Sequence, residues 1–223
     1  MTKCLLCEKR YHSVITLRQF LMFKEEQDVL CPTCQAGFEY LESPVCPGCG
    51  REKTKKLCLD CEKWKKKEGE ILRNRALFAY NATFKTWLHA VKMQGDIRLA
   101  GCLSHPLKQL YHDFSSYIWI PLPSSNENLR KRGFHQTILF LKEAKSPYQM
   151  VFEVEDSGEK QAYRNRYERL HHEREIWIHH LEKLTKPVIL FDDVYTTGAT
   201  MHQMASALKR AGVYSIQGIT LAR

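Results

Sequence analysis

The sequence lacks any apolar run that approaches the roughly 20 residues needed for a helix to cross a bilayer. It also lacks a recognisable export signal at its amino terminus. We therefore expect a soluble, cytoplasmic protein without membrane insertion. The length of 223 residues leaves room for one substantial domain and a small appendage.

Nine cysteines in a chain without an export signal indicate metal binding rather than disulfides. Eight of them form four Cys-x-x-Cys pairs, and each pair offers two sulfurs to one tetrahedral ion. We expect two structural zinc sites in a zinc-ribbon module spanning residues 1–70. Sequential pairing is favoured, and the spacing also allows an interleaved arrangement. The eight candidate ligands are Cys4, Cys7, Cys31, Cys34, Cys46, Cys49, Cys58 and Cys61.

The formal net charge of +9 at pH 7 suits partners that carry phosphate. Lysines concentrate directly after the last cysteine pair, at Lys63, Lys65, Lys66 and Lys67. One interpretation is a nucleic-acid surface in which Trp64 stacks on an exposed base. The alternative is a solvated basic face, with Trp64 packing the zinc module against the rest of the chain.

The stretch at residues 187–200 reads PVILFDDVYTTGAT. Its apolar run at residues 188–191 predicts a buried strand, and helical periodicity follows at residues 201–211. Backbone N–H groups at such a helix start converge on a phosphate, and acids at the end of such a strand accept hydrogen bonds from sugar hydroxyls. A phosphorylated ribose is the ligand that this pattern implies. The candidate residues are Asp192, Asp193, Thr196, Thr197, Gly198, Ala199 and Thr200.

This stretch resembles the motif that binds phosphoribosyl pyrophosphate (PRPP) in type I phosphoribosyltransferases. By this resemblance, Asp192 and Asp193 hold the 2′- and 3′-hydroxyls of ribose, residues 196–200 hold the 5′-phosphate, and Mg²⁺ accompanies PRPP. The resemblance implies an α/β fold of the type I phosphoribosyltransferase kind, with a parallel core sheet flanked by helices, for residues 71–223. The length of the motif disfavours the alternative, an ordinary strand-to-helix turn capped by Asp and Thr.

Periodicity predicts the remaining elements of this second domain. The expected strands lie at residues 71–80, 117–122, 149–154 and 214–221, and the expected helices at residues 84–93, 97–111 and 134–144. Thr83 is the expected N-cap of the first helix, and Pro106 is expected to bend or break the second. The leftover Cys102 falls in this second helix, where a buried, unreactive thiol is expected.

Residues 124–133 predict a polar loop that ends in a basic cluster. In type I phosphoribosyltransferases a loop after an early core strand binds pyrophosphate, and forked guanidinium donors match phosphate oxygens. The candidate pyrophosphate-binding residues are therefore Arg130, Arg132 and Gly133. A solvated basic turn is the alternative.

The run RKRGFHQ at residues 130–136 resembles the RxRGFNQ signature of ComF-type competence proteins, which join a zinc ribbon to a phosphoribosyltransferase domain. The match extends to the CxDCxxW run at residues 58–64 and to the PRPP motif, with His135 in place of the usual Asn. Residues 155–174 are similar to a lid segment of the same family. The resemblance implies PRPP binding and help with incoming single-stranded DNA during natural transformation, alongside other competence proteins.

Two other functions fit the same residues. One is an active phosphoribosyltransferase that uses a small-molecule acceptor, in salvage or amidotransfer. The other is a nucleic-acid-binding module whose PRPP site is vestigial. No residue identifies a catalytic nucleophile, and no segment after the PRPP motif indicates a nucleobase pocket. The pattern therefore identifies the ligand and leaves the reaction open.

Overall fold

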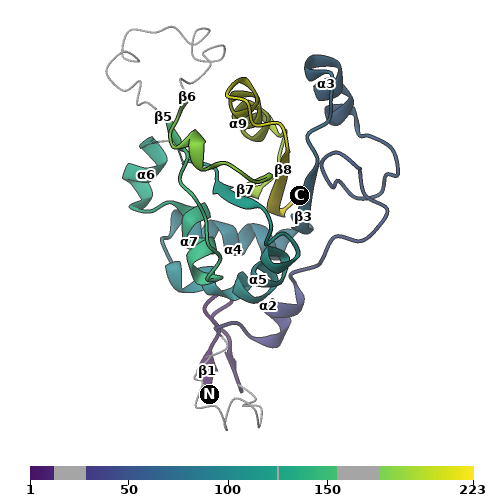
Figure 1. The fold of residues 1–223 in the computed structure, drawn as a ribbon. Coiled ribbons are helices and arrows are strands. Elements are labelled where there is room, and N and C mark those ends of the chain that lie inside the picture. Colours follow the sequence, from purple (N-terminus) through teal and green to yellow (C-terminus); the bar gives the residue numbers. More distant parts are fainter. Residues whose placement is uncertain (13–28, 125, 155–175) are drawn as a thin grey trace, which may run out of the picture.

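The structure is a computed structural model that describes residues 1–12, 29–124, 126–154 and 176–223. Its main sheet has four parallel strands in the order β3-β8-β7-β4 (Figure 1). These strands are β3 (Asn74–Phe78), β4 (Ile118–Pro121), β7 (Val188–Val194) and β8 (Ile216–Ala222). The last predicted strand, β8, pairs with β7, the strand of the PRPP motif.

Alternation of side chains along β7 divides the apolar core into two parts. Val188 and Leu190 face one cluster, which contains the buried residues of α9 (Ala199–Arg210). Ile189 and Phe191 face the other, which contains buried residues of α4 (Ala82–Met93), α5 (Ser104–Asp113) and α7 (Gln136–Glu143). The molecule thus has three layers, and the predicted α/β class with a parallel core sheet flanked by helices is confirmed.

Two helical segments differ from the sequence-based expectation, and a third is broken near Pro106 as predicted. The N-cap of α4 is Asn81, whose side chain accepts the N–H of Phe84, and not Thr83. The second helix is interrupted before Pro106, because the 3₁₀ helix η1 (Ile97–Leu103) precedes α5 and the proline falls in the tolerated first turn. Residues expected as a loop form α6 (Asn126–Arg132), which ends at Gly133 with φ 76°.

A short antiparallel pair lies outside the main sheet. It joins β5 (Phe152–Val154) to β6 (Ile176–Ile178), and the 3₁₀ helix η3 (Leu181–Lys183) leads from there towards β7. The predicted lid at residues 155–174 lies outside the described residues. Among the residues that the structure describes, no helix is long and apolar enough to span a membrane.

The N-terminal segment crosses the outer edge of the sheet at β3. There Leu41 donates its N–H to the carbonyl of Leu77 at 2.9 Å, and Ala79 donates to Glu39 at 2.9 Å. Cysteines of the first two pairs join the core on the α4 side, whereas those of the last two join the core on the α9 side. The segment therefore reaches both faces of the sheet. Its elements are β1 (Thr2–Lys3), β2 (Arg10–Tyr11), α2 (Pro32–Ala36) and α3 (Leu59–Glu68).

Candidate functional site

The two predicted ligand-binding segments follow neighbouring strands. Pro121 of β4 pairs with Phe191 of β7, and Leu122 extends the ladder by donating its N–H to the Phe191 carbonyl at 2.8 Å. The residues after β4 and the acids near the end of β7 therefore share one edge of the sheet. In open α/β proteins, ligands bind at this carboxyl edge of the strands.

Asp193 is buried and held by charged and polar neighbours. Lys92 places its Nζ 2.7 Å from Asp193 Oδ2, and the Gln136 amide donates to the same oxygen. Gln136 in turn accepts a hydrogen bond from Arg132. This network connects the candidate pyrophosphate residue Arg132 to the acid through one glutamine. Sequence reasoning missed the contacts of Lys92 and Gln136, although Gln136 closes the RKRGFHQ run.

Asp192 occupies a different environment from its neighbour. Because side chains alternate along a strand, Asp192 projects from the face of β7 opposite to Asp193. Its Oδ1 accepts the backbone N–H of Asp193 at 2.8 Å. Burial, and then the negative charge of Asp193, raises the pKa of Asp192 to about 8. The strand end thus carries two acids, one paired with a lysine and one that resists ionisation at neutral pH.

The predicted phosphate loop joins β7 to α9 through a glycine in a left-handed conformation. Gly198 has φ 80° and precedes the first residue of α9. A Cβ at this position would lie 2.1 Å from Tyr195 Oη, so only glycine fits. The first N–H groups of α9 have no intrahelical acceptor and carry the positive end of the helix dipole. The exposed residues of the loop are Thr196, Thr197, Ala199 and Thr200.

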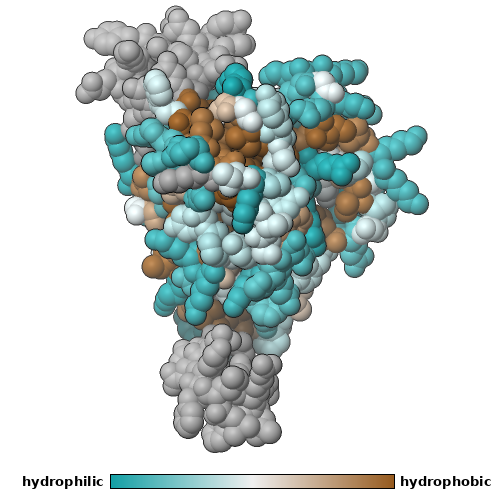
Figure 2. Space-filling model, in the orientation of Figure 1, coloured by the Kyte–Doolittle hydropathy of each residue, from teal (hydrophilic) through white to brown (hydrophobic). Residues whose placement is uncertain are grey.

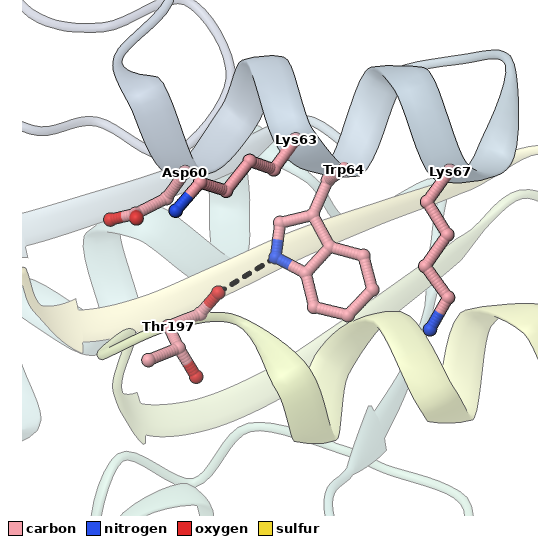
Figure 3. A pocket seen from close by; sticks show the side chains of 5 residues that line it. All are labelled: Asp60, Lys63, Trp64, Lys67 and Thr197. Carbon is pink, nitrogen blue, oxygen red and sulfur yellow. Dashed lines mark hydrogen bonds between the residues drawn. The ribbon is translucent and has the colours of Figure 1, made fainter.

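Helix α3 packs against this loop from the zinc module. Trp64 donates its indole N–H to the Thr197 carbonyl at 2.8 Å (Figure 3). The Trp64 ring also stacks on His202 of α9, with centroids 4.1 Å apart and planes 6° from parallel. Glu68 lies 2.8 Å from His202 Nδ1. Of the two interpretations of Trp64, packing between the module and the rest of the chain is the one observed.

Arg223 holds the same loop from the side of β8. One of its guanidinium nitrogens donates to the carbonyls of Tyr195 at 2.9 Å and Thr196 at 2.7 Å. Its Nε donates to Cys49 Sγ at 3.4 Å. One side chain thus links the second cysteine cluster to the phosphate loop. The sequence carries no local signal for this role, because Arg223 lies 27 residues beyond Thr196.

The eight paired cysteines form two clusters in the sequential arrangement. Within each cluster the four sulfurs lie within 4.8 Å of one another. The Cys7 and Cys31 sulfurs are 3.7 Å apart, and those of Cys49 and Cys58 are 3.6 Å apart. A tetrahedral zinc ion with Zn–S bonds of about 2.3 Å separates its sulfurs by about 3.8 Å. Both clusters therefore fit zinc, and each supplies a full set of four ligands.

Backbone donors favour the thiolate form at one cysteine of each cluster. Burial acts to raise the pKa of Cys4, but N–H groups of Cys7, Cys31 and Leu6 lower it to about 6. At Cys46 burial is likewise outweighed by nearby N–H groups, and the pKa falls to about 7. Thiolates are the form that binds metal.

The ninth cysteine lies outside both clusters. Burial raises the pKa of Cys102 to about 12, which keeps its thiol protonated at neutral pH. A protonated thiol is a poor nucleophile, which agrees with the predicted lack of reactivity, although Cys102 is half-buried against the core and not fully buried as predicted.

The candidate pyrophosphate residues lie on α6 and just after it. Arg132 reaches the acid network through Gln136, whereas Arg130 is exposed on the same helix. His135 occupies the N-cap of α7 without making a capping bond. Its Nδ1 is buried and has no hydrogen-bond partner among the described residues, and burial lowers its pKa. The structure thus brings Arg132 to the acids and leaves Arg130 farther out on the surface of α6.

A basic hollow lies beside the phosphate loop. It encloses about 240 Å³ and is lined by Asp60, Lys63, Trp64, Lys67 and Thr197 (Figure 3). The Lys67 ammonium lies 5.1 Å from the centre of the Trp64 ring. Figure 2 shows hydrophilic side chains over α3. The lysine run of the zinc module is therefore next to the candidate ligand site.

The fold and these sites define a class of α/β protein that combines a candidate phosphate site with two candidate zinc sites. The chain is 30% identical to competence protein ComFC of Streptococcus pneumoniae, over 99% of this chain and 100% of that protein. It is also 30% identical to competence protein ComFC of Bacillus subtilis, over 99% of this chain and 94% of that protein. The chain belongs to the ComFC family of competence proteins.

Comparisons with family models and with solved structures add little to this assignment. No model of a protein family matches the chain. A solved hypoxanthine phosphoribosyltransferase from Staphylococcus aureus is 16% identical and covers 56% of this chain and 63% of its own, with a TM-score of 0.29. A superposition this loose adds nothing to the strand order described above.

Proposed function

We propose that this chain binds PRPP, as its magnesium complex, at the edge formed by β4 and β7, and that it helps to handle single-stranded DNA during natural transformation. The observation that carries the proposal is the paired acids of β7, which lie directly before a loop whose backbone donors open α9. A phosphate and a ribose are the groups that these two neighbouring features recognise.

The ligand would lie across the end of β7. Residues 196–200 would hold the 5′-phosphate through backbone N–H groups and hydroxyls. Asp192 and Asp193 would accept hydrogen bonds from the ribose hydroxyls, and the contacts that Lys92 and Gln136 make with Asp193 are both at Oδ2. Arg130, Arg132 and Gly133 would hold the pyrophosphate, since Arg132 already lies within reach of the acid network.

The zinc ions would be structural. Each cluster supplies four sulfur ligands, which leaves no open position for water or substrate. We propose residues 1–70 as a zinc-ribbon module and residues 71–223 as the phosphoribosyltransferase-like domain. In this proposal the second zinc site sets the position of α3, because Cys58 is the residue at its N-cap.

The DNA role rests on the family and on the basic face of α3. The two relatives are named as competence proteins, and the exposed lysines of α3 suit a phosphate backbone. We propose that single-stranded DNA follows this face, beside the PRPP site, and that the chain acts in the cytoplasm together with other competence proteins.

Calorimetric titration of the zinc-loaded protein tests both parts in one series. Mg²⁺·PRPP is added first, and a single-stranded oligonucleotide is then added to the complex. We expect saturable heat for each addition, and loss of the first heat alone in the double variant Asp192→Ala with Asp193→Ala. Absence of PRPP binding to the folded wild-type chain would overturn the PRPP assignment, and absence of oligonucleotide binding would overturn the DNA assignment.

A further inference from the structure

We infer that Trp64 and Arg223 are positioning residues that orient the backbone of the phosphate loop. The inference rests on the proposed PRPP site and deepens it. The ligand would lie against the N–H groups of the loop, whereas both side chains donate hydrogen bonds to its carbonyl oxygens. Their contacts are with three successive carbonyl groups, those of Tyr195, Thr196 and Thr197.

Because of the geometry of the peptide bond, the direction of each of these carbonyls also fixes the direction of the N–H group of the following residue. In a planar trans peptide, the carbonyl of one residue and the N–H of the next point in opposite directions. Arg223 draws the carbonyls of Tyr195 and Thr196 towards β8, and Trp64 draws the Thr197 carbonyl towards α3. The N–H groups of Thr196, Thr197 and Gly198 consequently point away from α3 and β8.

Both positioning side chains are themselves held in place. Trp64 lies between α3 and α9, stacked on His202, which is 2% exposed and paired with Glu68. Arg223 directly follows β8 and continues its pairing with β3, because the backbone N–H of Arg223 donates to the Phe78 carbonyl at 3.1 Å. Its guanidinium also lies 5.2 Å from the centre of the Tyr195 ring. The indole of Trp64 and the guanidinium of Arg223 are therefore fixed in position, and they bind the carbonyl oxygens on the side of the loop opposite its N–H groups.

The peptide between Thr197 and Gly198 has the greatest need of such support. Gly198 adopts φ 80°, and a glycine passes between conformations that other residues avoid. Without a partner for the Thr197 carbonyl, this peptide is free to rotate, and the Gly198 N–H turns away from an anion. The Trp64 indole thus fixes the donor nearest the start of α9.

Trp64→Phe is the decisive variant, because phenylalanine keeps an aromatic ring on His202 and removes the indole donor. Arg223 is less suitable, since it also contacts Cys49 of a cysteine cluster. A matched control is Trp87→Phe, which removes an equal indole-to-carbonyl bond of 2.8 Å, to Leu99, from the core. Replacement of Trp64 by benzothienylalanine, in which sulfur replaces the indole N–H, gives a second variant with unchanged shape.

Two measurements test whether Trp64 orients the loop. Residual dipolar couplings of the free, zinc-loaded protein report the direction of the Gly198 N–H bond and are expected to change in Trp64→Phe but not in Trp87→Phe. Affinity for ribose 5-phosphate is expected to fall about tenfold in Trp64→Phe, the loss of one hydrogen bond to a charged group. Affinity for inorganic pyrophosphate, which the proposed function assigns to other residues, is expected to stay the same in both variants.

The outcomes separate this inference from the proposed function. Unchanged couplings at Gly198, or equal ribose 5-phosphate affinity in wild type and both Trp64 variants, would overturn the positioning role while PRPP binding stands. Equal loss of ribose 5-phosphate and pyrophosphate binding would show general damage and would also overturn it. A wild-type protein that binds neither Mg²⁺·PRPP nor ribose 5-phosphate refutes the proposed function, and the couplings alone then decide whether Trp64 orients the loop.

Discussion

Lys92 Nζ lies 2.7 Å from Asp193 Oδ2 and joins the last turn of α4 to the end of β7. The lysine side chain is 19% exposed and the aspartate side chain 6%. Two buried charges of opposite sign compensate each other, whereas either one alone faces the full cost of leaving water. The pair therefore links the stability of the fold to the acid that we assign to ribose.

Lys92→Met is expected to lower the free energy of unfolding by about 3 kcal/mol, because Asp193 is left buried without its cation. Adding Asp193→Asn is expected to restore most of this loss, since the buried charge is then gone. Urea denaturation of the zinc-loaded single and double variants measures both values. A double variant no more stable than Lys92→Met would show that the loss comes from packing of the lysine stem.

Local sequence patterns name those candidate site residues that lie close together in the chain. The apolar run, the acids and Gly198 lie within one short stretch, and each cysteine pair is a local signal. The contacts that organise these parts are not local. Trp64 and Thr197 are 133 residues apart, and Gln136 and Asp193 are 57 apart. No periodicity or spacing rule joins residues at such separations, so they required the folded structure.

The α6 segment shows a different limit of prediction from sequence. Its polar residues suggested a loop, yet its charged and leucine residues also favour a helix, and Gly133 supplies a helix end. Tertiary context decided between two local interpretations. The correction matters for function, because it places Arg130 and Arg132 on a helix rather than on a flexible turn.

The double variant Asp192→Ala with Asp193→Ala is expected to abolish binding of Mg²⁺·PRPP, because both acceptors for the ribose hydroxyls are removed. Calorimetric titration measures the binding, and circular dichroism verifies that the fold is preserved. The control is Glu143→Ala on α7, an exposed acid of the same domain. Retained PRPP affinity in a folded double variant would contradict the assignment of these acids.

The raised pKa of Asp192 predicts a dependence of stability on pH. The native state keeps a proton on Asp192 up to about pH 8, whereas the unfolded chain loses it near pH 4. Stability contributed by this proton is therefore present at low pH and lost as pH rises through this window, by up to about 1.4 kcal/mol per pH unit.

Asp192→Asn removes this titration. Relative to wild type, the variant is expected to gain stability as pH rises from about 5.5 to about 7.5. Urea denaturation at several pH values, with zinc present throughout, gives the difference between the two proteins. The difference cancels the contributions of cysteines and histidines that both proteins share. Parallel curves would mean that Asp192 titrates normally in the folded chain.

The two cysteine clusters are expected to differ in their effect on the ligand site. Cys58 is at the N-cap of α3, which carries Trp64 to the phosphate loop, whereas Cys7 belongs to the cluster on the other face of the sheet. Cys58→Ser and Cys7→Ser are each expected to lower bound zinc from about two ions to about one. Only Cys58→Ser is expected to weaken Mg²⁺·PRPP binding.

Zinc content by elemental analysis and PRPP affinity by calorimetry check the two effects separately. Cys102→Ser is the matched control and is expected to change neither, because Cys102 lies outside both clusters. Equal losses of PRPP affinity in Cys58→Ser and Cys7→Ser would contradict a specific link between the second cluster and the loop.

Binding of single-stranded DNA is expected to depend on salt through the lysines of α3. Each lysine that neutralises a phosphate releases a counterion, and for single strands the slope of log K against log salt changes by about 0.7 per contact. Changing Lys63, Lys65, Lys66 and Lys67 to glutamine is therefore expected to weaken binding and to reduce the slope by up to about 3. Fluorescence anisotropy with an oligo-dT strand over a salt series measures both quantities.

The control changes four exposed lysines of the α4, α5 and α7 side, namely Lys85, Lys108, Lys142 and Lys145. Both quadruple variants lose the same net charge, so equal effects would mean that the strand responds to total charge and not to the face of α3 beside the phosphate loop.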